Sequence, residues 1–357
     1  MIIVEALPAD DGDCLWLEWD HDGRWRRMLV DGGRSNRRSD VVPGGLTARF
    51  DRQPVDQRDF ELVVCTHIDA DHIGGLLALF QQPPAGFSAS DVWFNGPDHL
   101  AGDLLGPAHG DAFVELLDNR WPWNTMFDGH AVVVPERGQP PVIELPGLRL
   151  TLLSPDVPGL RQLALDWPAV VRDFEADTSP DGPADLLGVR DPGVPLAELA
   201  AAGYSRDSSA ANGSSIAFVV EHTDRARVLL GADAHGEVLA AGLRALRPGG
   251  RYPVDLCKAP HHGSRGNVSP GLLSALDCQH WLISTNGARH SHPDRRAVAR
   301  ILDRCDAPEL WFNYRSASTE EFADPTLADR FGARTHYPRA GRTGIRLTVG
   351  AGRVERA

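Results

Sequence analysis

Short apolar segments separated by polar turns organise the first part of the chain. Residues 2–6, 14–19 and 27–30 alternate or run apolar, and Asp- and Gly-rich stretches separate them. Alternation with a period of two between turn residues predicts β-strands joined as hairpins. The run 62–65 is bounded and rich in β-branched residues, which predicts a buried strand, and the apolar segment that begins at Ile73 predicts a packed helix.

The same succession of strands and helices returns in the second half of the chain. Segments 214–220 and 227–230 predict a β-pair, and 141–153 predicts a hairpin that turns at Pro146-Gly147. Further strands are expected at 254–257, 281–284, 310–313 and 344–349, and helices at 236–246, 270–276 and 295–305. Strands and helices that alternate in this way favour an α/β (α+β) fold, here a four-layer αββα sandwich with two facing sheets and helices outside.

The composition changes between residues 154 and 211, where Pro, Asp, Gly and Ala dominate and strand formers are few. We interpret 154–211 as an insertion with short helical pieces, because long irregular segments in compact domains tend to be functional or disordered. It could serve as a mobile lid over a site or form a surface excursion. The chain is otherwise expected to be a single domain over 1–357, with another helix within 103–120.

Composition and charge narrow the functional classes. The chain is 42% apolar and 24% charged, as in ordinary globular proteins, and no apolar run approaches the ~20 residues of a membrane span. Its first residues show no basic region before an apolar stretch, so no signal peptide is expected. Five scattered cysteines without a Cys-x-x-Cys are typical of buried side chains in a reducing compartment, and we expect a cytoplasmic protein without membrane contact.

Two imidazoles and two carboxylates lie between His67 and His72, directly after the predicted strand 62–65 and before the predicted helix. They are therefore expected on a loop at the C-terminal end of a strand, where open α/β sheets place their ligand sites. Neutral imidazole and carboxylate are ligands for zinc, manganese and iron. The alternative is a polar turn with a solvated His–Asp network.

The segment His67-x-Asp69-x-Asp71-His72-x-Gly74-Gly75 resembles the first motif of the metallo-β-lactamase superfamily, whose commoner form is His-x-His-x-Asp-His. The Asp in the third position is typical of one branch, the metal-hydrolase domain of the competence protein ComEC and its stand-alone relatives. The resemblance implies a metallo-β-lactamase fold and metal-dependent hydrolysis. It does not extend to the ComEC membrane channel, so DNA uptake is not implied.

Further segments resemble later motifs of the family, in order along the chain. Gly12-Asp13 and Asp31-Gly32-Gly33 resemble features of its opening hairpin, and Gly231-Ala232-Asp233 resembles its Gly-Asp motif. The closing motifs are similar to Lys258-x-x-His261-His262-Gly263-Ser264 and to Asn286 followed by His292-Pro293, with a slightly wider gap. Asn212-x-x-Ser215 stands where many members of the superfamily place a lone metal-binding histidine.

The resemblance implies roles for these residues. The expected metal ligands are His67, Asp69, Asp71, His72, Asp233 and His261, with Asn212 and Ser215 in support. Asp233 would bridge two divalent ions, zinc or manganese, although it could instead cap the helix that follows. The expected catalytic residues are Asp71, which orients the water, His262, Ser264 and a protonated His292, which contact phosphate or the leaving oxygen, and Lys258, which is either structural or neutralises phosphate. The replacement of imidazoles by Asp69 and Asn212 gives one metal position harder, oxygen donors in place of nitrogen and could leave that position weakly occupied or empty.

These residues predict a metal-dependent hydrolase, in first place a phosphodiesterase or nuclease that acts on DNA or RNA through a metal-activated water. Two alternatives stay open: hydrolysis of a small substrate such as a cyclic nucleotide, lactone or thioester, and a non-catalytic metal-binding component of a multi-protein system, for example in defence. The net charge of −13 weighs against nucleic acid. A basic protein partner, or a local groove lined by Arg265, Arg289, Arg295 and Arg296, could offset it.

Overall fold

The computed structural model describes residues 1–34, 45–100, 112–117, 120–177, 191 and 193–357, and its two largest sheets carry the fold. The first sheet contains, in spatial order, β19 (Arg353–Arg356), β18 (Ile345–Gly350), β1 (Ile2–Ala6), β2 (Leu15–His21), β3 (Arg24–Val30), β5 (Leu62–Val64) and β7 (Val92–Trp93). The second contains β17 (Arg334–His336), β16 (Glu309–Phe312), β15 (His280–Ile283), β13 (Leu256–Lys258), β11 (Arg227–Leu230), β10 (Ala217–His222), β9 (Leu148–Ser154) and β8 (Val142–Leu145). Two short pairs, β4 (Asp59–Phe60) with β6 (Ser88–Ala89) and β12 (Tyr252–Pro253) with β14 (Leu276–Asp277), accompany them.

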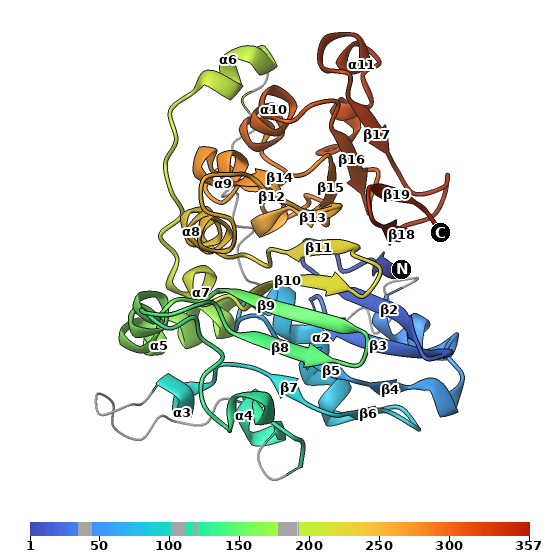
Figure 1. Ribbon diagram of the computed structural model, residues 1–357, viewed down its shortest axis with the longest axis vertical. Helices are drawn as coiled ribbons and strands as arrows, with labels where there is room; N and C mark the ends of the chain where they lie inside the picture. The colour runs from blue at the N-terminus through green and yellow to red at the C-terminus, as the bar shows by residue number, and fades with distance from the viewer. Residues whose placement is uncertain (35–44, 101–111, 118–119, 178–190, 192) are drawn as a thin grey trace.

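Helices lie outside the sheets and in the connections (Figure 1). In chain order they are α1 (Leu46–Asp51), α2 (Ala70–Gln81), α3 (Pro97–Leu100), α4 (Ala112–Leu117), α5 (Val157–Asp177), α6 (Leu196–Ala201), α7 (Ala210–Gly213), α8 (Gly236–Leu246), α9 (Pro270–Ala275), α10 (Arg295–Arg304) and α11 (Thr326–Phe331). Short 3₁₀ turns occur at Val55–Gln57, Thr125–Phe127, Pro260–Gly263 and Glu320–Ala323.

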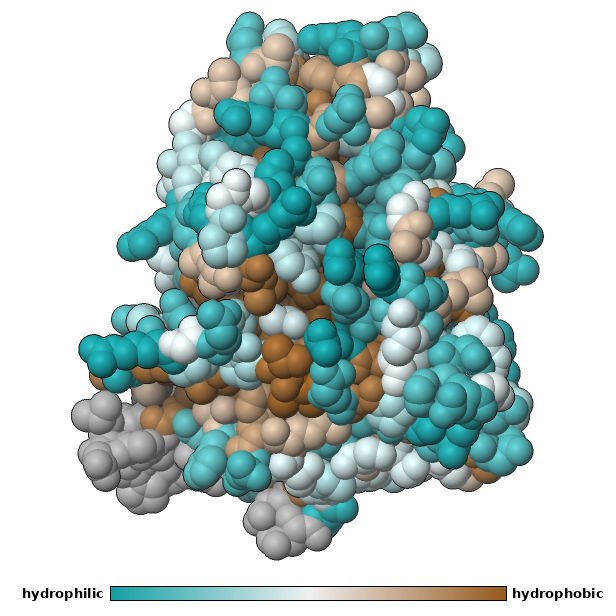
Figure 2. Space-filling view, in the orientation of Figure 1, coloured by the Kyte–Doolittle hydropathy of each residue, from teal (hydrophilic) through white to brown (hydrophobic). Residues whose placement is uncertain are grey.

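Three apolar cores separate the four layers. Between the sheets, alternate residues of facing strands meet, among them Val4 and Leu17 from the first sheet and Phe218 from the second. A second core packs α8, α9 and α10 against the outer face of the second sheet. A third packs α2 and aromatic side chains such as Trp16 and Phe60 against the outer face of the first sheet. The predicted αββα sandwich is therefore confirmed. In the space-filling view hydrophilic side chains cover most of the surface, and apolar ones gather mainly in the middle (Figure 2).

The strand connections bring the polar loops to one edge. β3, β5 and β7 run parallel, as do β11, β13, β15 and β16. The C-terminal ends of parallel strands meet at the same edge of a sheet, which is where open α/β folds place their sites. The loops after β3, β5, β11 and β13 are therefore close in space although far apart in sequence.

The segment interpreted as an irregular insertion contains a long helix instead. α5 covers 21 residues, and Leu163 and Trp167 of its buried face pack with Ile68 from the metal-motif loop. Asp156 precedes it and accepts a hydrogen bond from the Gly159 backbone N–H at 2.8 Å, an N-terminal cap that outweighs the local Pro and Gly content. Residues 178–190 and 192 of the predicted insertion lie outside the described residues, as does most of the helix predicted within 103–120 beyond α4.

One buried ion cluster lies on the strands β16 and β17. Glu309 accepts hydrogen bonds from Arg334 and from His336, whose ring stacks on Trp311 at 3.7 Å between centroids. Burial by itself would raise the pKa of Glu309, but the hydrogen bonds from Arg334 and His336 outweigh it and lower that pKa.

The cysteines are all buried and none forms a disulfide. Among the described residues, no helix has the length and apolar character needed to cross a membrane.

Candidate metal centre

The residues of the first motif lie where β5 ends and α2 begins. Helix α2 starts at Ala70, and the backbone N–H of His72 donates to the Asp69 carbonyl at 2.9 Å. Asp71 and His72 therefore lie in the first turn of the helix and not on a loop, which corrects the expectation from sequence. A helix turn fixes the direction of both side chains more firmly than a loop would.

Strained backbone surrounds this position. Ala232, His261 and His262 have φ angles of +44°, +47° and +53°, and Asp31 has +60°. Each such residue costs about 1–3 kcal/mol, and residues of this kind concentrate at functional sites because the surrounding fold must hold them there.

Three histidines are each held through Nδ1, so that Nε2 is left with a lone pair. His72 Nδ1 donates to the Asp31 carboxylate at 2.8 Å, and His262 Nδ1 donates to the Ser284 carbonyl at 2.8 Å. Thr66 donates its hydroxyl hydrogen to Asp31 at 2.8 Å, so its oxygen is the acceptor for His67 Nδ1 at 3.0 Å. Carboxylates and carbonyls accept only, which fixes these tautomers and orients the rings as second-shell partners orient metal-bound histidines.

The Nε2 atoms of His72 and His262 face each other at 3.3 Å, with two carboxylate oxygens beside them. His72 Nε2 lies 3.3 Å from Asp233 Oδ2 and 3.8 Å from Asp71 Oδ2. His262 Nε2 lies 3.3 Å from Asp71 Oδ2 and 3.5 Å from Asp233 Oδ2. A tetrahedron with the usual zinc–nitrogen and zinc–oxygen bonds has edges of about 3.3–3.6 Å. Four of these five distances lie in that range and the fifth, 3.8 Å, is slightly longer, so the four atoms are arranged closely enough to hold one divalent ion.

A second group of donors adjoins the first through Asp233. His67, His72 and Asp233 present ligand atoms that lie within 4.8 Å of one another. His67 Nε2 and Asp233 Oδ1 are buried and have no hydrogen-bond partner among the described residues. Asp69 Oδ2 lies 3.4 Å from His67 Nε2, but its side chain is 40% exposed. Two unpartnered polar atoms at one point fit a cation, and the exposure of Asp69 makes this position more open than the first.

His261 approaches the same carboxylate from the other side. Its Nε2 lies 3.6 Å from Asp233 Oδ2, and its Nδ1 lies 3.0 Å from Asn267 Oδ1 and 3.4 Å from Asp207 Oδ2. Sequence analysis put His261 on the metal and His262 toward phosphate. The structure brings both rings to Asp233, and of the two only His262 also contacts Asp71.

The supporting residue Asn212 is held by Asp207, to which its amide donates at 2.7 Å. The Asn212 Oδ1 atom and the Ser215 hydroxyl are buried without a hydrogen-bond partner among the described residues. Asp207 also accepts from Asn267 at 3.0 Å, and hydrogen bonds from His261 hold its pKa below the usual range although burial alone would raise it. Sequence analysis missed Asp207 and Asn267, because neither belongs to a motif.

Lys258, the single lysine of the chain, lies behind the cluster and is fully buried. Its ammonium pairs with Asp13, donates to the Ala232 carbonyl at 3.2 Å and lies 3.7 Å from Asp233 Oδ1. Burial would raise the pKa of Asp13, but Lys258 and His262 hold it at about 2. A side chain so enclosed has no access to a substrate phosphate, so of the two predicted roles the structure favours the structural one.

His292 and Ser264 lie close by. His292 is 2% exposed, its ring centroid is 5.1 Å from that of His261, and neither ring nitrogen has a hydrogen-bond partner among the described residues. Burial, together with the neighbouring histidines, holds the pKa of His292 well below its usual value. This lowered pKa favours the neutral imidazole in the protein alone; the predicted protonated form in contact with phosphate stays a prediction. The Ser264 hydroxyl accepts from the Gly266 backbone N–H at 3.2 Å.

The electrostatic field of the cluster favours positive charge. Burial disfavours the charged form of His72, but Asp233, Asp71 and Asp31 outweigh it and raise the pKa of His72 well above its usual value. His262 shows the same balance, with Asp233 and Asp13 raising its pKa. Carboxylates that stabilise a positive charge among imidazoles also stabilise a divalent cation at the same point.

Close backbone contacts leave no room for side chains under the helix. A Cβ atom on Gly12 would lie 1.8 Å from the Asp71 carbonyl oxygen, and one on Gly75 would lie 2.0 Å from the Gly32 carbonyl oxygen. The opening hairpin therefore touches the metal-motif helix through glycines, which explains the Gly-Asp and Asp-x-Gly patterns in the sequence.

Residues 9–163 match the family model of the metallo-beta-lactamase superfamily. This stretch, less than half of the chain, is similar to the metallo-beta-lactamase superfamily. Members of this superfamily are metal-dependent hydrolases and commonly use zinc. A comparison with curated proteins gave no match, and the predicted membership of the ComEC-like branch stays a prediction.

The chain also resembles solved structures of low sequence identity. The metallo-beta-lactamase fold protein YhfI from Bacillus subtilis is 10% identical, covers 98% of this chain and 99% of its own, and superposes with a TM-score of 0.39. A structure described as a possible metal-dependent hydrolase from Veillonella parvula is 10% identical, covers 96% and 98%, and has a TM-score of 0.41. Human tRNase Z, short form, is 11% identical, covers 98% and 99%, and has a TM-score of 0.37. Likeness at this level carries no argument about substrate.

Proposed function

We propose that the protein is a metal-dependent phosphodiesterase that hydrolyses nucleic acid, DNA or RNA. The observation that carries this proposal is the convergence of His72 Nε2, His262 Nε2 and the carboxylates of Asp71 and Asp233, with N···N and N···O distances of 3.3–3.8 Å, close to the edge lengths of a metal tetrahedron. His67 and Asp69 would complete a second position beside it, with His261 at its margin. Bound divalent ions supply Lewis-acid polarisation of a phosphoryl oxygen and activation of the attacking water.

The donor types suggest different ions for the two positions. Two imidazoles and two carboxylates in a closed, buried tetrahedron suit zinc. Beside His67, the further donor is the Asp69 carboxylate, and sites richer in oxygen donors favour manganese. Because Asp69 is half exposed, we expect this second position to be the weaker one.

The protein residues keep the donors in place and move protons. Asp31 holds His72 and, through Thr66, His67, so one buried carboxylate orients two imidazoles. Asp71 would orient the attacking water and accept its proton. His292 is buried, neither ring nitrogen has a hydrogen-bond partner among the described residues, and Nδ1 lies 3.7 Å from Asp294 Oδ2, so the ring can take up a proton when anionic phosphate arrives and pass it to the leaving oxygen. Lys258 is a positioning residue, since its ammonium fixes Asp13 and Asp233.

The test is a cleavage assay on labelled single- and double-stranded DNA and RNA, with zinc, manganese or magnesium added. Asp71→Ala is compared with wild type and with Asp56→Ala, which removes an exposed carboxylate elsewhere. We expect metal-dependent cleavage that Asp71→Ala abolishes and Asp56→Ala preserves, and metal content is measured on each protein in parallel.

Two results would overturn the proposal. Metal bound at the site without cleavage of any polymer would move the function to a small substrate such as a cyclic nucleotide, lactone or thioester. A protein that binds no metal in any buffer would leave only a non-catalytic role in a larger assembly.

A further inference from the structure

Two of the four arginines expected to form a basic groove beside the late motifs, Arg295 and Arg296, are engaged elsewhere. Arg295 donates to Glu321 at 2.6 Å and to backbone carbonyls of residues 191 and 194, and Arg296 pairs with Asp191 at 2.7 Å. These side chains fasten the segment around Asp191 to helix α10. The positive charge beside the late motifs is therefore smaller than the sequence suggests, and other arginine-rich parts of the surface are candidates for contact with nucleic acid.

Such a surface exists on the outer face of the first sheet, where two cavities adjoin. One has a volume of about 510 Å³ and the other about 820 Å³, and Glu5, Arg52 and Arg346 line both. Together seven arginines line them against three acidic side chains, Glu5, Glu18 and Asp51. We call this surface the arginine groove; its arginines are Arg27, Arg49, Arg52, Arg339, Arg342, Arg346 and Arg356.

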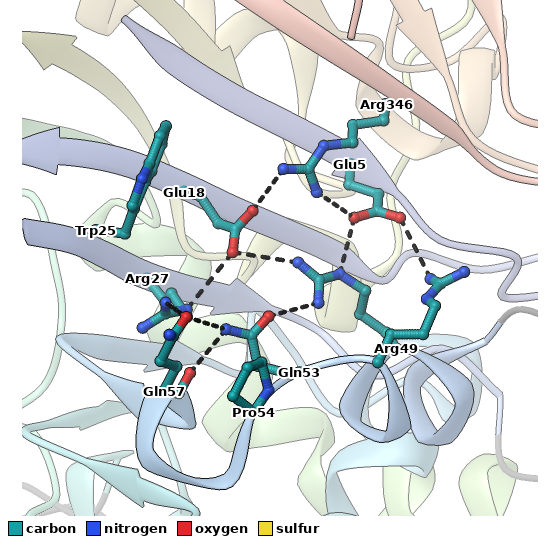
Figure 3. A pocket seen from close by; sticks show the side chains of 10 residues that line it. Glu5, Glu18, Trp25, Arg27, Arg49, Gln53, Pro54, Gln57 and Arg346 are labelled. Atoms are coloured by element: carbon teal, nitrogen blue, oxygen red, sulfur yellow. Dashed lines mark hydrogen bonds and ion pairs between the residues drawn. The ribbon is translucent and has the colours of Figure 1, made fainter.

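A rigid ion lattice forms the floor of the groove (Figure 3). Glu5 accepts from Arg49 and from Arg346, each at 2.9 Å, and Glu18 lies 2.7 Å from Arg346 and 3.2 Å from Arg49. Glu18 also lies 3.5 Å from Arg27, which is directly opposite on the next strand. Arg27 also lies 3.5 Å from Asp59, so the floor pairs its arginines with carboxylates, and these ion pairs hold the floor in place before any ligand binds; the excess of positive charge comes from the arginines of the rim.

Exposed arginines line the rim. Arg52 is 58% exposed, and its one ion pair, with Glu5, is 3.5 Å long. Arg339 and Arg342 are exposed and form no ion pair with any described residue. They stand at the two ends of a tight turn closed by the Arg342 backbone N–H on the Arg339 carbonyl at 2.9 Å. Their guanidinium donors are therefore available to an anion, next to a floor that does not neutralise them.

The groove wall is linked to the metal centre by hydrogen bonds. The Gly344 backbone N–H donates to the Asn313 carbonyl at 2.7 Å, and the Asn313 amide donates to the Ser284 hydroxyl at 3.1 Å. Ser284 is the residue whose carbonyl holds His262. Leu7 and Pro8 line the groove and lead directly into the loop that carries Asp13. The groove thus opens at the same end of the strands as the metal centre.

We propose that the arginine groove binds the phosphates of a nucleic-acid strand and guides that strand toward the metal centre. The inference builds on the proposed nuclease function, to which it adds the contact surface. It also explains how a protein with a net charge of −13 binds nucleic acid, since a local excess of arginines attracts polyphosphate even on an acidic protein. The groove contacts the backbone and reads no bases, so binding is expected to be independent of sequence.

The test is the binding of a fluorescein-labelled 20-nucleotide single strand, RNA or DNA, followed by fluorescence anisotropy between 50 and 200 mM salt. Arg339→Gln/Arg342→Gln is compared with wild type and with Arg304→Gln/Arg330→Gln, which removes the same charge from exposed positions outside the groove. We expect the groove variant to bind about tenfold more weakly at physiological salt. Its plot of log K against log salt should be shallower by about 1.4, for two lost single-strand phosphate contacts. The control variant should stay close to wild type.

Equal binding by the groove variant and the control variant would overturn the inference. So would a mononucleotide or pyrophosphate that binds as tightly as the 20-nucleotide strand, since the groove would then hold a small phosphate ligand. Probe integrity is read on a gel from the same samples. If binding is weaker in the groove variant but no protein cleaves the strand, only the nuclease proposal is refuted. If the strand is cleaved but the groove variant binds it as tightly as the control variant does, only the groove inference is refuted.

Discussion

Asp31→Asn is the substitution that most directly tests how the metal centre is held. Asp31 is fully buried and accepts hydrogen bonds at 2.8 Å from the Thr66 backbone N–H, the Thr66 hydroxyl and His72 Nδ1. An amide keeps the shape but has one accepting oxygen. Whichever way the amide is turned, at least one donor of Thr66 or His72 faces an N–H₂ group.

Two consequences follow, and they are measured separately. A buried donor without an acceptor costs about 1–3 kcal/mol of the free energy of unfolding. His72 either loses its carboxylate partner or changes tautomer, which places the proton on Nε2, where the lone pair was. Loss of such a partner typically weakens metal binding about 10–100-fold. Zinc and manganese affinity is measured by calorimetric titration of metal-stripped protein, and stability by urea unfolding.

Asp91→Asn provides a matched control. Asp91 is fully buried too and accepts from the backbone N–H groups of Thr125 and Met126 at 2.9 and 3.0 Å, and from Trp93 at 3.2 Å. It should lose similar stability and keep its metal affinity. If Asp31→Asn binds metal as tightly as Asp91→Asn does, the argument that Asp31 fixes the histidine tautomer is refuted.

Further predictions concern packing, charge and pH. Gly12→Ala places a Cβ atom 1.8 Å from the Asp71 carbonyl oxygen, so unfolding in urea should show a loss of about 3 kcal/mol; an unchanged midpoint would contradict the close contact. Lys258→Met removes the ammonium partner of buried Asp13, which keeps only His262 at 3.5 Å, and should cost about 3–5 kcal/mol, part of which the double variant with Asp13→Asn should restore; additive losses would argue against the pair. The lowered pKa of Glu309 means that its ionised form stabilises the fold above its unfolded pKa of about 4.3, and that this stability is lost as the pH falls through the lower folded value. The melting temperature of Glu309→Gln should therefore lie below that of wild type at pH 6 and approach it near pH 3, and a constant difference would refute the assignment.

The sequence by itself determined most of the layer arrangement. Alternation of apolar residues marks β1, β2 and β3, because each strand buries one side against the facing sheet and the other under helices or ions. The polar residues after β5, β11 and β13 could be assigned to one edge of the sandwich, because parallel strands end together. The αββα fold and the segments that carry the candidate site were thus predictable without a structure.

Local composition misled at two points. Pro and Gly within 154–211 suggested irregular chain, yet α5 forms because Leu163 and Trp167 pack against Ile68. Ile68 lies almost one hundred residues earlier in the chain, far outside the window over which helix propensity acts. Asp71 and His72 were expected on a loop, whereas the helix begins at Ala70. Tertiary packing determined that α5 forms, and the position of the helix start determined where Asp71 and His72 lie. A short window of sequence encodes neither the packing nor the helix start.

Only the tertiary structure decided how the chemistry is assembled. Sequence could name His67, His72 and His262, but which ring nitrogen is free depends on Asp31 and Ser284, which lie on other strands. The partner of Lys258 and the arginine groove likewise arise from residues distant in the chain. The periodicity of apolar residues reflects which side of an element is buried, and all residues on that side contribute to the signal. Hydrogen-bond partners and local charge excess depend on the distance between particular atoms, and that distance exists only once the sheets have packed.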